Sequence, residues 1–210
     1  MDITFYFDPL CPWCWMTDTW VRSVAEDRNL NITHIPISLK LKNGDMPEPW
    51  STRANNSLKM LRVIEYMRMN GAEDKVSAVY KHLGTAIHRD GLLAEDNPDI
   101  KAAIVSALKD SDLDSAWADE MDKEELTKAV LSSTDAAITL AGEDVGTPII
   151  AFKDAGGKDA ALFGPVISQL PPTHEEALEL WDAYVVFATK PYFWELKRTR
   201  TEGPNVESTF

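Results

Sequence analysis

The stretch Asp8-Pro9-Leu10-Cys11-Pro12-Trp13-Cys14-Trp15 holds the only two cysteines of a 210-residue chain, and two residues separate them. The apolar run 3–7 comes directly before this stretch and predicts a buried strand. Apolar residues recur at helical spacing directly after it, at Met16, Trp20, Val21 and Val24. The two thiols are therefore expected where a strand ends and a helix begins.

This position favours redox chemistry of the thiols. The amino end of a helix presents unpaired N–H groups and the positive end of the helix dipole, which stabilise a thiolate. We therefore expect Cys11 to be the nucleophile of disulfide exchange. Cys14 follows about one helical turn later on the same face, so it can attack a mixed disulfide on Cys11 and release the product. Trp13 is expected to form a flat apolar surface beside the reacting sulfur.

Two structural alternatives exist for the cysteine pair. A zinc site needs about four ligands. The sequence has no second cysteine pair, and its four histidines are scattered, so no metal is expected. Two inert buried thiols are the other alternative. In a reducing compartment, a Cys-x-x-Cys spacing is more typical of a redox-active pair.

The rest of the amino-terminal part predicts a β-α-β unit. A helix is expected from about Pro12 to Arg28, and Pro12 suits the first helical position because its missing N–H costs nothing there. A second strand is expected over residues 32–39, where Pro36 indicates that one edge of the strand is unpaired or irregular. A loop rich in structure breakers follows at residues 43–49.

Residues 50–141 have helical patterns and no strand signal. Apolar spacing predicts helices over 50–71 and 76–84, with Gly84 stopping the second. Further helical segments are expected to begin at Asn97-Pro98, near Leu113, and at a capping box of Asp122 with Glu125. The apolar faces of these helices are expected to include Trp50, Leu58, Leu61, Ile64, Val130 and Leu140.

Strand patterns return after Thr147. Residues 149–152 and 160–163 flank a turn and predict a β-hairpin. A capping box of Thr173 with Glu176 then opens an amphipathic helix. This order predicts an α/β protein with a small four-stranded sheet covered by helices on both faces, which is the thioredoxin fold with an inserted all-helical domain. The expected boundaries are 1–45 and 144–202 for the two halves of the fold, 46–143 for the insertion and 203–210 for a flexible tail.

The net charge of −13 argues against a nucleic-acid partner, because phosphate binding needs clustered Lys and Arg. Much of the acidity falls in residues 90–145, with fifteen Asp and Glu against four Lys, and is expected on solvated helix faces. No apolar run approaches the ~18 residues of a membrane helix. No leader-like segment precedes the first strand, so a cytoplasmic protein without a membrane partner is expected.

The motif Cys11-Pro12-Trp13-Cys14, the pair Thr147-Pro148 and the inserted helical block resemble the DsbA-like branch of the thioredoxin superfamily. Within that branch, the chain is most similar to the actinobacterial mycothiol-dependent nitroreductase and mycoredoxin-like proteins. The blocks that carry this resemblance are residues 7–15, 83–88, 142–148, 163–166 and 195–202. The resemblance implies a cytoplasmic thiol-disulfide oxidoreductase that holds no bound cofactor and uses mycothiol as co-substrate. Its implied substrates are mixed disulfides, with nitro compounds as a further class.

The resemblance also implies where substrate binds. Pro148 is expected in the cis form facing Cys11, and Thr147 is expected to present its backbone to the substrate. Further residues implied around the cleft are Pro12, Trp13, Asn43 and His88. For Asn43 an ordinary turn residue remains an alternative, and for His88 a histidine packed between helices.

Three other functions remain open from the sequence. A DsbA-type protein disulfide oxidoreductase or isomerase would use the same dithiol. A redox-inert binding module would use the helical block as its surface, but the placement of Cys11 and Cys14 at a helix start argues against it. The kappa-class glutathione transferases share the insertion topology, but they usually carry serine at the position of Cys11.

Overall fold

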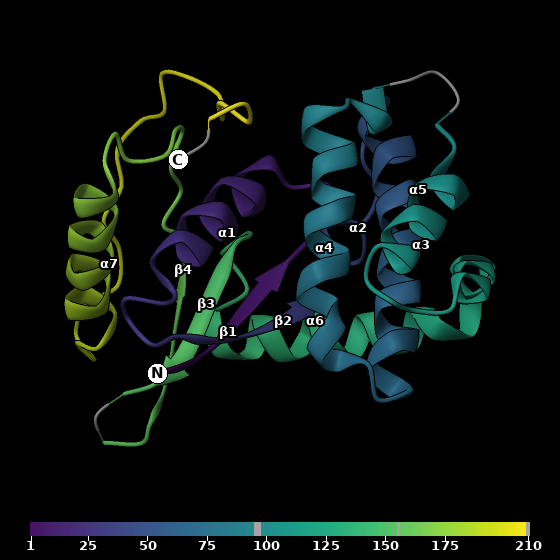
Figure 1. Ribbon diagram of the computed structural model, residues 1–210. Coiled ribbons are helices and arrows are strands. Elements are labelled where there is room, and N and C mark those ends of the chain that lie inside the picture. The colour runs from purple at the N-terminus through teal and green to yellow at the C-terminus, as the bar shows by residue number, and fades with distance from the viewer. Residues whose placement is uncertain (95–97, 155, 209–210) are drawn as a thin grey trace.

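The computed structural model describes residues 1–94, 98–154 and 156–208 and contains a four-stranded sheet with the order β2-β1-β3-β4 (Figure 1). β1 pairs with β2 in parallel and with β3 antiparallel, and β3 and β4 form the predicted hairpin. β2 lies at an edge and ends at Pro36, as its proline indicates. The strands span Asp2–Phe7 (β1), Asn31–Pro36 (β2), Ile149–Lys153 (β3) and Asp159–Phe163 (β4).

Helices cover both faces of this sheet. On one face, α1 (Pro12–Val24) and α7 (His174–Ala188) pack together, and the buried Trp20 indole donates a hydrogen bond to the Ala177 carbonyl. On the other face, Ala137 of α6 (Thr127–Ala141) packs in a core cluster with Tyr6 and Ile149 of the strands. This arrangement, with helices inserted between β2 and β3, confirms the predicted fold.

The inserted segment forms a separate group of helices beside the sheet (Figure 1). It contains α2 (Leu39–Asn43), α3 (Trp50–Met69), α4 (Val76–Gly84) and α5 (Ile100–Lys109), with 3₁₀ turns at 73–75, 92–94, 115–122 and 124–126. α6 ends this segment in the chain and, unlike the other inserted helices, forms one layer of the thioredoxin fold. No helix within the described ranges is long and apolar enough to cross a membrane.

Some helix starts differ from the sequence-based expectation. The start expected at Asn97 lies outside the described residues, and the side chain of Asp99 caps α5 by accepting from the Ala102 N–H. The capping box expected at Asp122 is wrong, because a 3₁₀ turn intervenes and α6 has no side-chain cap. The cap at Thr173 is confirmed, since its hydroxyl accepts from the Glu176 N–H.

Two residues assigned to apolar faces are exposed. Trp50 is 48% exposed and Leu140 is 40% exposed. Both lie at the ends of their helices, where helical spacing continues but no element among the described residues buries the side chain. The Trp50 ring instead lies under the Arg53 guanidinium, with 5.3 Å from its central carbon to the ring centroid.

Gly84 ends α4 as the sequence predicts, and it also has a packing role that the sequence does not show. A Cβ atom at this position would lie 2.4 Å from Cε3 of Trp15, so glycine permits close packing of α4 on α1. The backbone remains helical beyond Gly84, but with a different hydrogen-bond pattern. It continues as a π-helical turn over Thr85–Arg89, a wider turn often found at functional sites.

The carboxyl-terminal residues 203–208, expected to be flexible, contact the body of the protein. The Asn205 N–H donates to the Ser168 carbonyl, and the Ser208 hydroxyl accepts from the Leu170 N–H. Val206 is partly buried against the main core. Through these contacts, the carboxyl-terminal residues pack against the loop between β4 and α7.

Candidate active site

The two cysteines lie where β1 ends and α1 begins. Cys11 is the N-cap residue of α1, Pro12 occupies the first turn, and Cys14 lies further along that turn. Both cysteines are free thiols. Cys11 is 6% exposed and Cys14 is fully buried. An incoming disulfide can therefore reach only Cys11 without rearrangement.

Thr147 and Pro148 form the facing wall. The peptide bond between them is cis, as the resemblance implies. The Cys11 thiol donates to the Thr147 carbonyl with 3.7 Å from Sγ to the oxygen, although these residues are 136 positions apart in the chain. The Thr147 hydroxyl is buried and has no hydrogen-bond partner in this dithiol state. It is therefore free to donate to a thiolate.

The two thiols have opposite acidities. The hydrogen bond from Cys14 lowers the pKa of Cys11, assisted by the Thr147 hydroxyl and the Cys14 backbone N–H, and these outweigh the effect of burial. Burial raises the pKa of Cys14 well above its usual value, and its hydrogen bond to Cys11 acts in the same direction. The negative charge is thus favoured on the more accessible sulfur, which is the arrangement needed for Cys11 to attack first.

Asp8 connects this motif to the inserted helices, and sequence reasoning missed its role. Its buried carboxylate accepts hydrogen bonds from the Leu10 and Leu39 N–H groups and from the Ser57 hydroxyl of α3. Burial raises its pKa despite these bonds. A charged residue between a buried strand and the Cys-x-x-Cys motif was a visible signal, but its partners come from distant segments.

Trp13 is partly buried, and its ring lies under the guanidinium of Arg200, 5.1 Å from its central carbon to the centroid. The carboxyl-terminal segment therefore passes beside the dithiol. Arg200 falls within the block 195–202 that carries the family resemblance, but no role at the site was expected for it, because 187 positions separate it from Trp13.

His88 and Asn43 have different surroundings. His88 Nε2 donates to the Pro9 carbonyl at 2.9 Å, and its ring centroid lies 6.0 Å from that of Trp15, which places it against the loop before Cys11. Burial lowers its pKa to about 4, so it is neutral at pH 7. Asn43 is exposed at the end of α2, and no hydrogen bond in the described part of the chain links its side chain to the dithiol.

Replacing Thr147 with valine should raise the pKa of Cys11. Valine has a similar shape but removes the hydroxyl that can donate to the thiolate. The pH dependence of thiolate absorbance, together with the rate of alkylation at Cys11, measures this change. Thr85→Val, which removes a partly buried hydroxyl from the π-helical turn, is a matched control and should leave the titration unchanged. An unaltered Cys11 titration in Thr147→Val would show that the hydroxyl does not contribute.

Replacing His88 with glutamine should reduce the acid sensitivity of the fold. Between the usual histidine pKa of 6.5 and the lowered value of about 4, the unfolded state binds a proton that the folded state does not. The stability of the wild type should therefore fall as pH decreases through this window. Glutamine can retain an N–H donor toward Pro9 without titrating. Urea unfolding at several pH values tests this, with His82→Gln as the exposed control.

No group of three or more His, Cys, Asp or Glu among the described residues is arranged to hold a metal ion.

A thioredoxin-type sheet, a Cys-x-x-Cys pair at the start of α1 and a facing cis-proline define a DsbA-like thiol-disulfide oxidoreductase. The family model described as "Rv2466c-like: Mycothiol-dependent nitroreductase Rv2466c" matches residues 10–198. The chain belongs to this family, which confirms the resemblance seen in the sequence.

A curated relative, the uncharacterized protein Rv2286c of Mycobacterium tuberculosis, is 26% identical over 201 residues, covering 95% of this chain and 82% of the relative. Among solved structures, the cytosolic disulfide reductase DsbM from Pseudomonas aeruginosa has a TM-score of 0.56 at 14% identity, covering 90% of this chain and all of that one. A 2-hydroxychromene-2-carboxylate isomerase has a TM-score of 0.54 at 16% identity, covering 88% and 94%. Because this fold also carries an isomerase, fold alone does not define the activity.

Proposed function

We propose that this protein is a cytoplasmic, mycothiol-dependent reductase of mixed disulfides, with nitro compounds as a further substrate class. The observation that carries the proposal is the inequality of the two thiols. Cys11 is the more acidic and the more accessible, while Cys14 is buried and protonated behind it. Membership of the mycothiol-dependent nitroreductase family supports mycothiol as the thiol partner.

The reduction proceeds in two exchanges. The Cys11 thiolate attacks one sulfur of the substrate disulfide, the substrate S–S bond breaks, and the leaving thiolate takes up a proton from solvent. Cys14 then loses its proton and attacks the Cys11 sulfur, which forms the Cys11–Cys14 disulfide and releases the second substrate thiol. Two mycothiol molecules return the protein disulfide to the dithiol and are themselves oxidised to a disulfide.

Trp13, Thr147 and Pro148 are proposed to bind the substrate next to Cys11. The Thr147 carbonyl already occupies the position of a hydrogen-bond partner for this sulfur. The Trp13 ring provides an apolar surface beside the thiol, and Arg200 places a positive charge over it. Pro12 lies in the first turn of α1, next to Cys11, and His88 donates to the Pro9 carbonyl in the loop before Cys11. We therefore assign both residues a positioning role. Asn43 is proposed at the outer edge of the cleft.

The test measures turnover with mycothiol, its reductase and NADPH against a mycothiol mixed disulfide, a protein disulfide and a nitroaromatic compound. We expect turnover of the mixed disulfide. Parallel reactions replace mycothiol with glutathione or with thioredoxin. Turnover that depends on either of these and not on mycothiol would reject the mycothiol assignment, and exclusive turnover of the protein disulfide would favour a DsbA-type oxidoreductase.

A further inference from the structure

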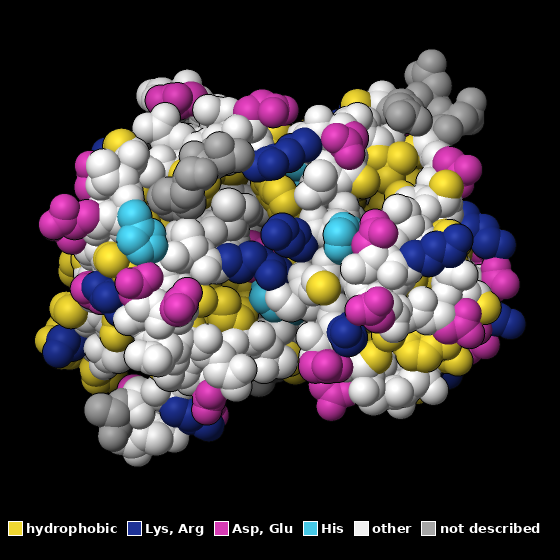
Figure 2. Space-filling model, in the orientation of Figure 1, with side chains coloured by type: hydrophobic (Ala, Val, Ile, Leu, Met, Phe, Trp, Pro, Cys, Tyr) yellow, Lys and Arg dark blue, Asp and Glu magenta, His cyan; other side chains and the backbone are white. Residues whose placement is uncertain are grey.

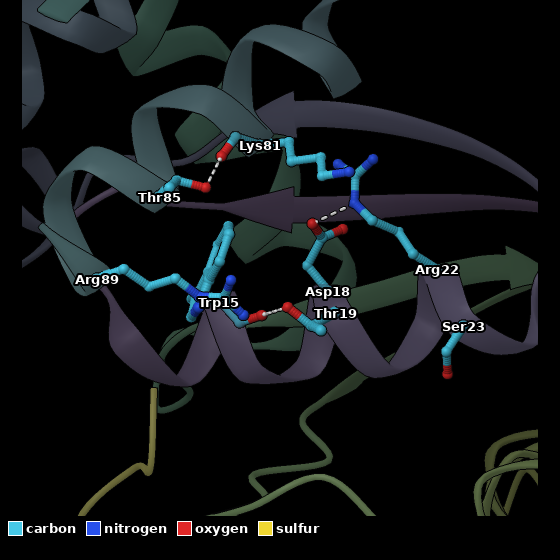
Figure 3. Close-up of a pocket in the computed structure, with 8 residues that line it drawn as sticks. All are labelled: Trp15, Asp18, Thr19, Arg22, Ser23, Lys81, Thr85 and Arg89. Carbon is cyan, nitrogen blue, oxygen red and sulfur yellow. Dashed lines mark hydrogen bonds and ion pairs between the residues drawn. The ribbon is translucent and has the colours of Figure 1, made fainter. Parts of the chain in front are cut away.

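A concave site lies along α1, on residues other than the two cysteines. It is a groove of about 310 Å³ between α1 and the α4–π-turn segment, and neither cysteine lines it. The side chains around it are Trp15, Asp18, Thr19, Arg22, Ser23, Lys81, Thr85 and Arg89 (Figure 3). In the space-filling view, Lys and Arg side chains gather in the hollow between the two halves of the molecule (Figure 2).

The charge of this groove is opposite to that of the whole protein. Arg22, Lys81 and Arg89 line it against a single carboxylate, that of Asp18, in a chain with a net charge of −13. Asp18 is already paired, at 2.5 Å from Arg22 and 2.7 Å from His34. Lys81 and Arg89 have no carboxylate partner within the described residues. Two positive charges without a carboxylate partner in the described part of the chain therefore line the groove.

Two of the cations, Lys81 and Arg22, approach one another at one end of the groove (Figure 3). Figure 3 shows the Lys81 side chain extending from α4 toward the guanidinium of Arg22. Arg89 lies at the other end, with its guanidinium carbon 5.9 Å from the Trp15 ring centroid. Like charges brought together in a partly enclosed space repel unless an anion lies between them. An anion held by both ends of the groove would remove this repulsion and gain charge-assisted hydrogen bonds.

The hydroxyl groups of the groove define the rest of the ligand. Thr19 donates to the Trp15 carbonyl at 2.8 Å, and Thr85 donates to the Lys81 carbonyl at 2.9 Å. Ser23 likewise donates to the Trp20 carbonyl. Because their protons are engaged, these hydroxyls can serve as acceptors. The groove therefore offers cationic donors for an anion and hydroxyl acceptors for O–H donors.

We propose that this groove binds a small phosphorylated polyol. The phosphate group lies between the two ends of the groove, with Lys81 at one end and Arg89 at the other (Figure 3). Neither of these two cations has a carboxylate partner among the described residues. The hydroxyls of the ligand donate to Thr19 and Thr85. A volume of about 310 Å³ is at the lower end of the range of small-molecule sites and accommodates such a molecule. The site is separate from the dithiol, so it does not depend on the proposed reductase activity.

The experiment uses glycerol phosphate, inorganic phosphate and uncharged glycerol as probes at constant ionic strength. Titration of the full-length protein is followed by amide and indole NMR shifts. We expect saturable shifts at Trp15, Thr19 and Thr85, with glycerol phosphate binding more tightly than phosphate and glycerol not binding. Equal affinity for the two phosphates would reject the polyol part of the proposal. The absence of saturable shifts with either phosphate would reject the site.

Variants that remove the same charge at different places distinguish binding in the groove from non-specific attraction of the ligand to positive charge. Lys81→Gln with Arg89→Gln should weaken glycerol phosphate binding by about tenfold or more, because two charge-assisted hydrogen bonds are lost. Lys109→Gln with Lys128→Gln removes the same charge from exposed positions outside the groove and should leave affinity unchanged. Equal losses in both double variants would indicate non-specific attraction. Cys11→Ser should bind the ligand like the wild type, so failure of the reductase proposal would leave this result intact.

Discussion

Cys11→Ser should lose disulfide-exchange activity to the background level, the largest effect on activity that we expect from any single substitution. Serine keeps the size and position of the side chain, but its hydroxyl is not ionised at neutral pH and cannot replace the thiolate nucleophile. Cys11 has the lowered pKa and is the more accessible of the two thiols, so its sulfur is the one that attacks the substrate. Steady-state turnover and stoichiometric reaction of the purified dithiol with a disulfide measure the loss.

Cys14→Ser is the matched comparison, because it alters the other thiol of the same turn. It should retain the first exchange and then stop, leaving a substrate attached to Cys11 that mass spectrometry detects. The retained first step should proceed at a rate close to that of the wild type, because the serine hydroxyl can donate to Cys11 in place of the Cys14 thiol, whose hydrogen bond is the main cause of the lowered pKa. Full activity of Cys11→Ser would reject the dithiol mechanism, and a substrate trapped on Cys14 in Cys11→Ser at the wild-type rate would reverse the assignment of roles.

Local patterns were sufficient for much of the fold and for the centre of the site. The apolar run of β1, the proline after Cys11 and the helical spacing beyond it each act over a few residues, and together they locate the dithiol at the start of α1. The pairing of Thr147-Pro148 with Cys11 did not follow from spacing. It came from resemblance to a family, because 136 positions separate Cys11 from Thr147.

The parts that the sequence did not predict are contacts between distant segments. Asp8 is an example, since its carboxylate holds N–H and hydroxyl groups from the segments before α1, at α2 and in α3. Helical periodicity also cannot show where a neighbouring element is missing, which is why Trp50 was expected on an apolar helix face although it is exposed. Gly84 ends α4 as expected, but its second role, which is to admit the Trp15 ring, did not follow from the sequence.

A buried charged network on α1 belongs to the same class of unpredicted contacts. Asp18 and His34 are almost fully buried, and the Asp18 carboxylate lies 2.7 Å from His34 Nε2 of β2 and 2.5 Å from Arg22 Nε. Arg22 also donates to the Ser77 hydroxyl and carbonyl of α4. The network therefore ties α1 to the sheet and to the inserted helices.

Asp18→Ala should destabilise the protein by about 3 kcal/mol, the largest loss of stability that we expect. Removing one member of a buried ion pair costs roughly 3–5 kcal/mol because the remaining charges stay buried without a partner. We expect the lower end of that range, because the Arg22 side chain is 26% exposed and water can partly compensate it. Urea unfolding at neutral pH measures the change. Asp182→Ala removes a carboxylate paired with Arg28 at the surface and should have little effect.

The pH dependence of this difference tests its electrostatic origin. Burial alone would raise the pKa of Asp18, but the charges of His34 and Arg22 outweigh it and lower the pKa below the usual 3.8. Because the pKa is lower in the folded state, the stabilisation is present above 3.8 and is lost as pH falls through the lowered value. The gap between wild type and Asp18→Ala should therefore narrow in strong acid. A gap that stays constant down to full protonation would assign the loss to packing rather than to charge.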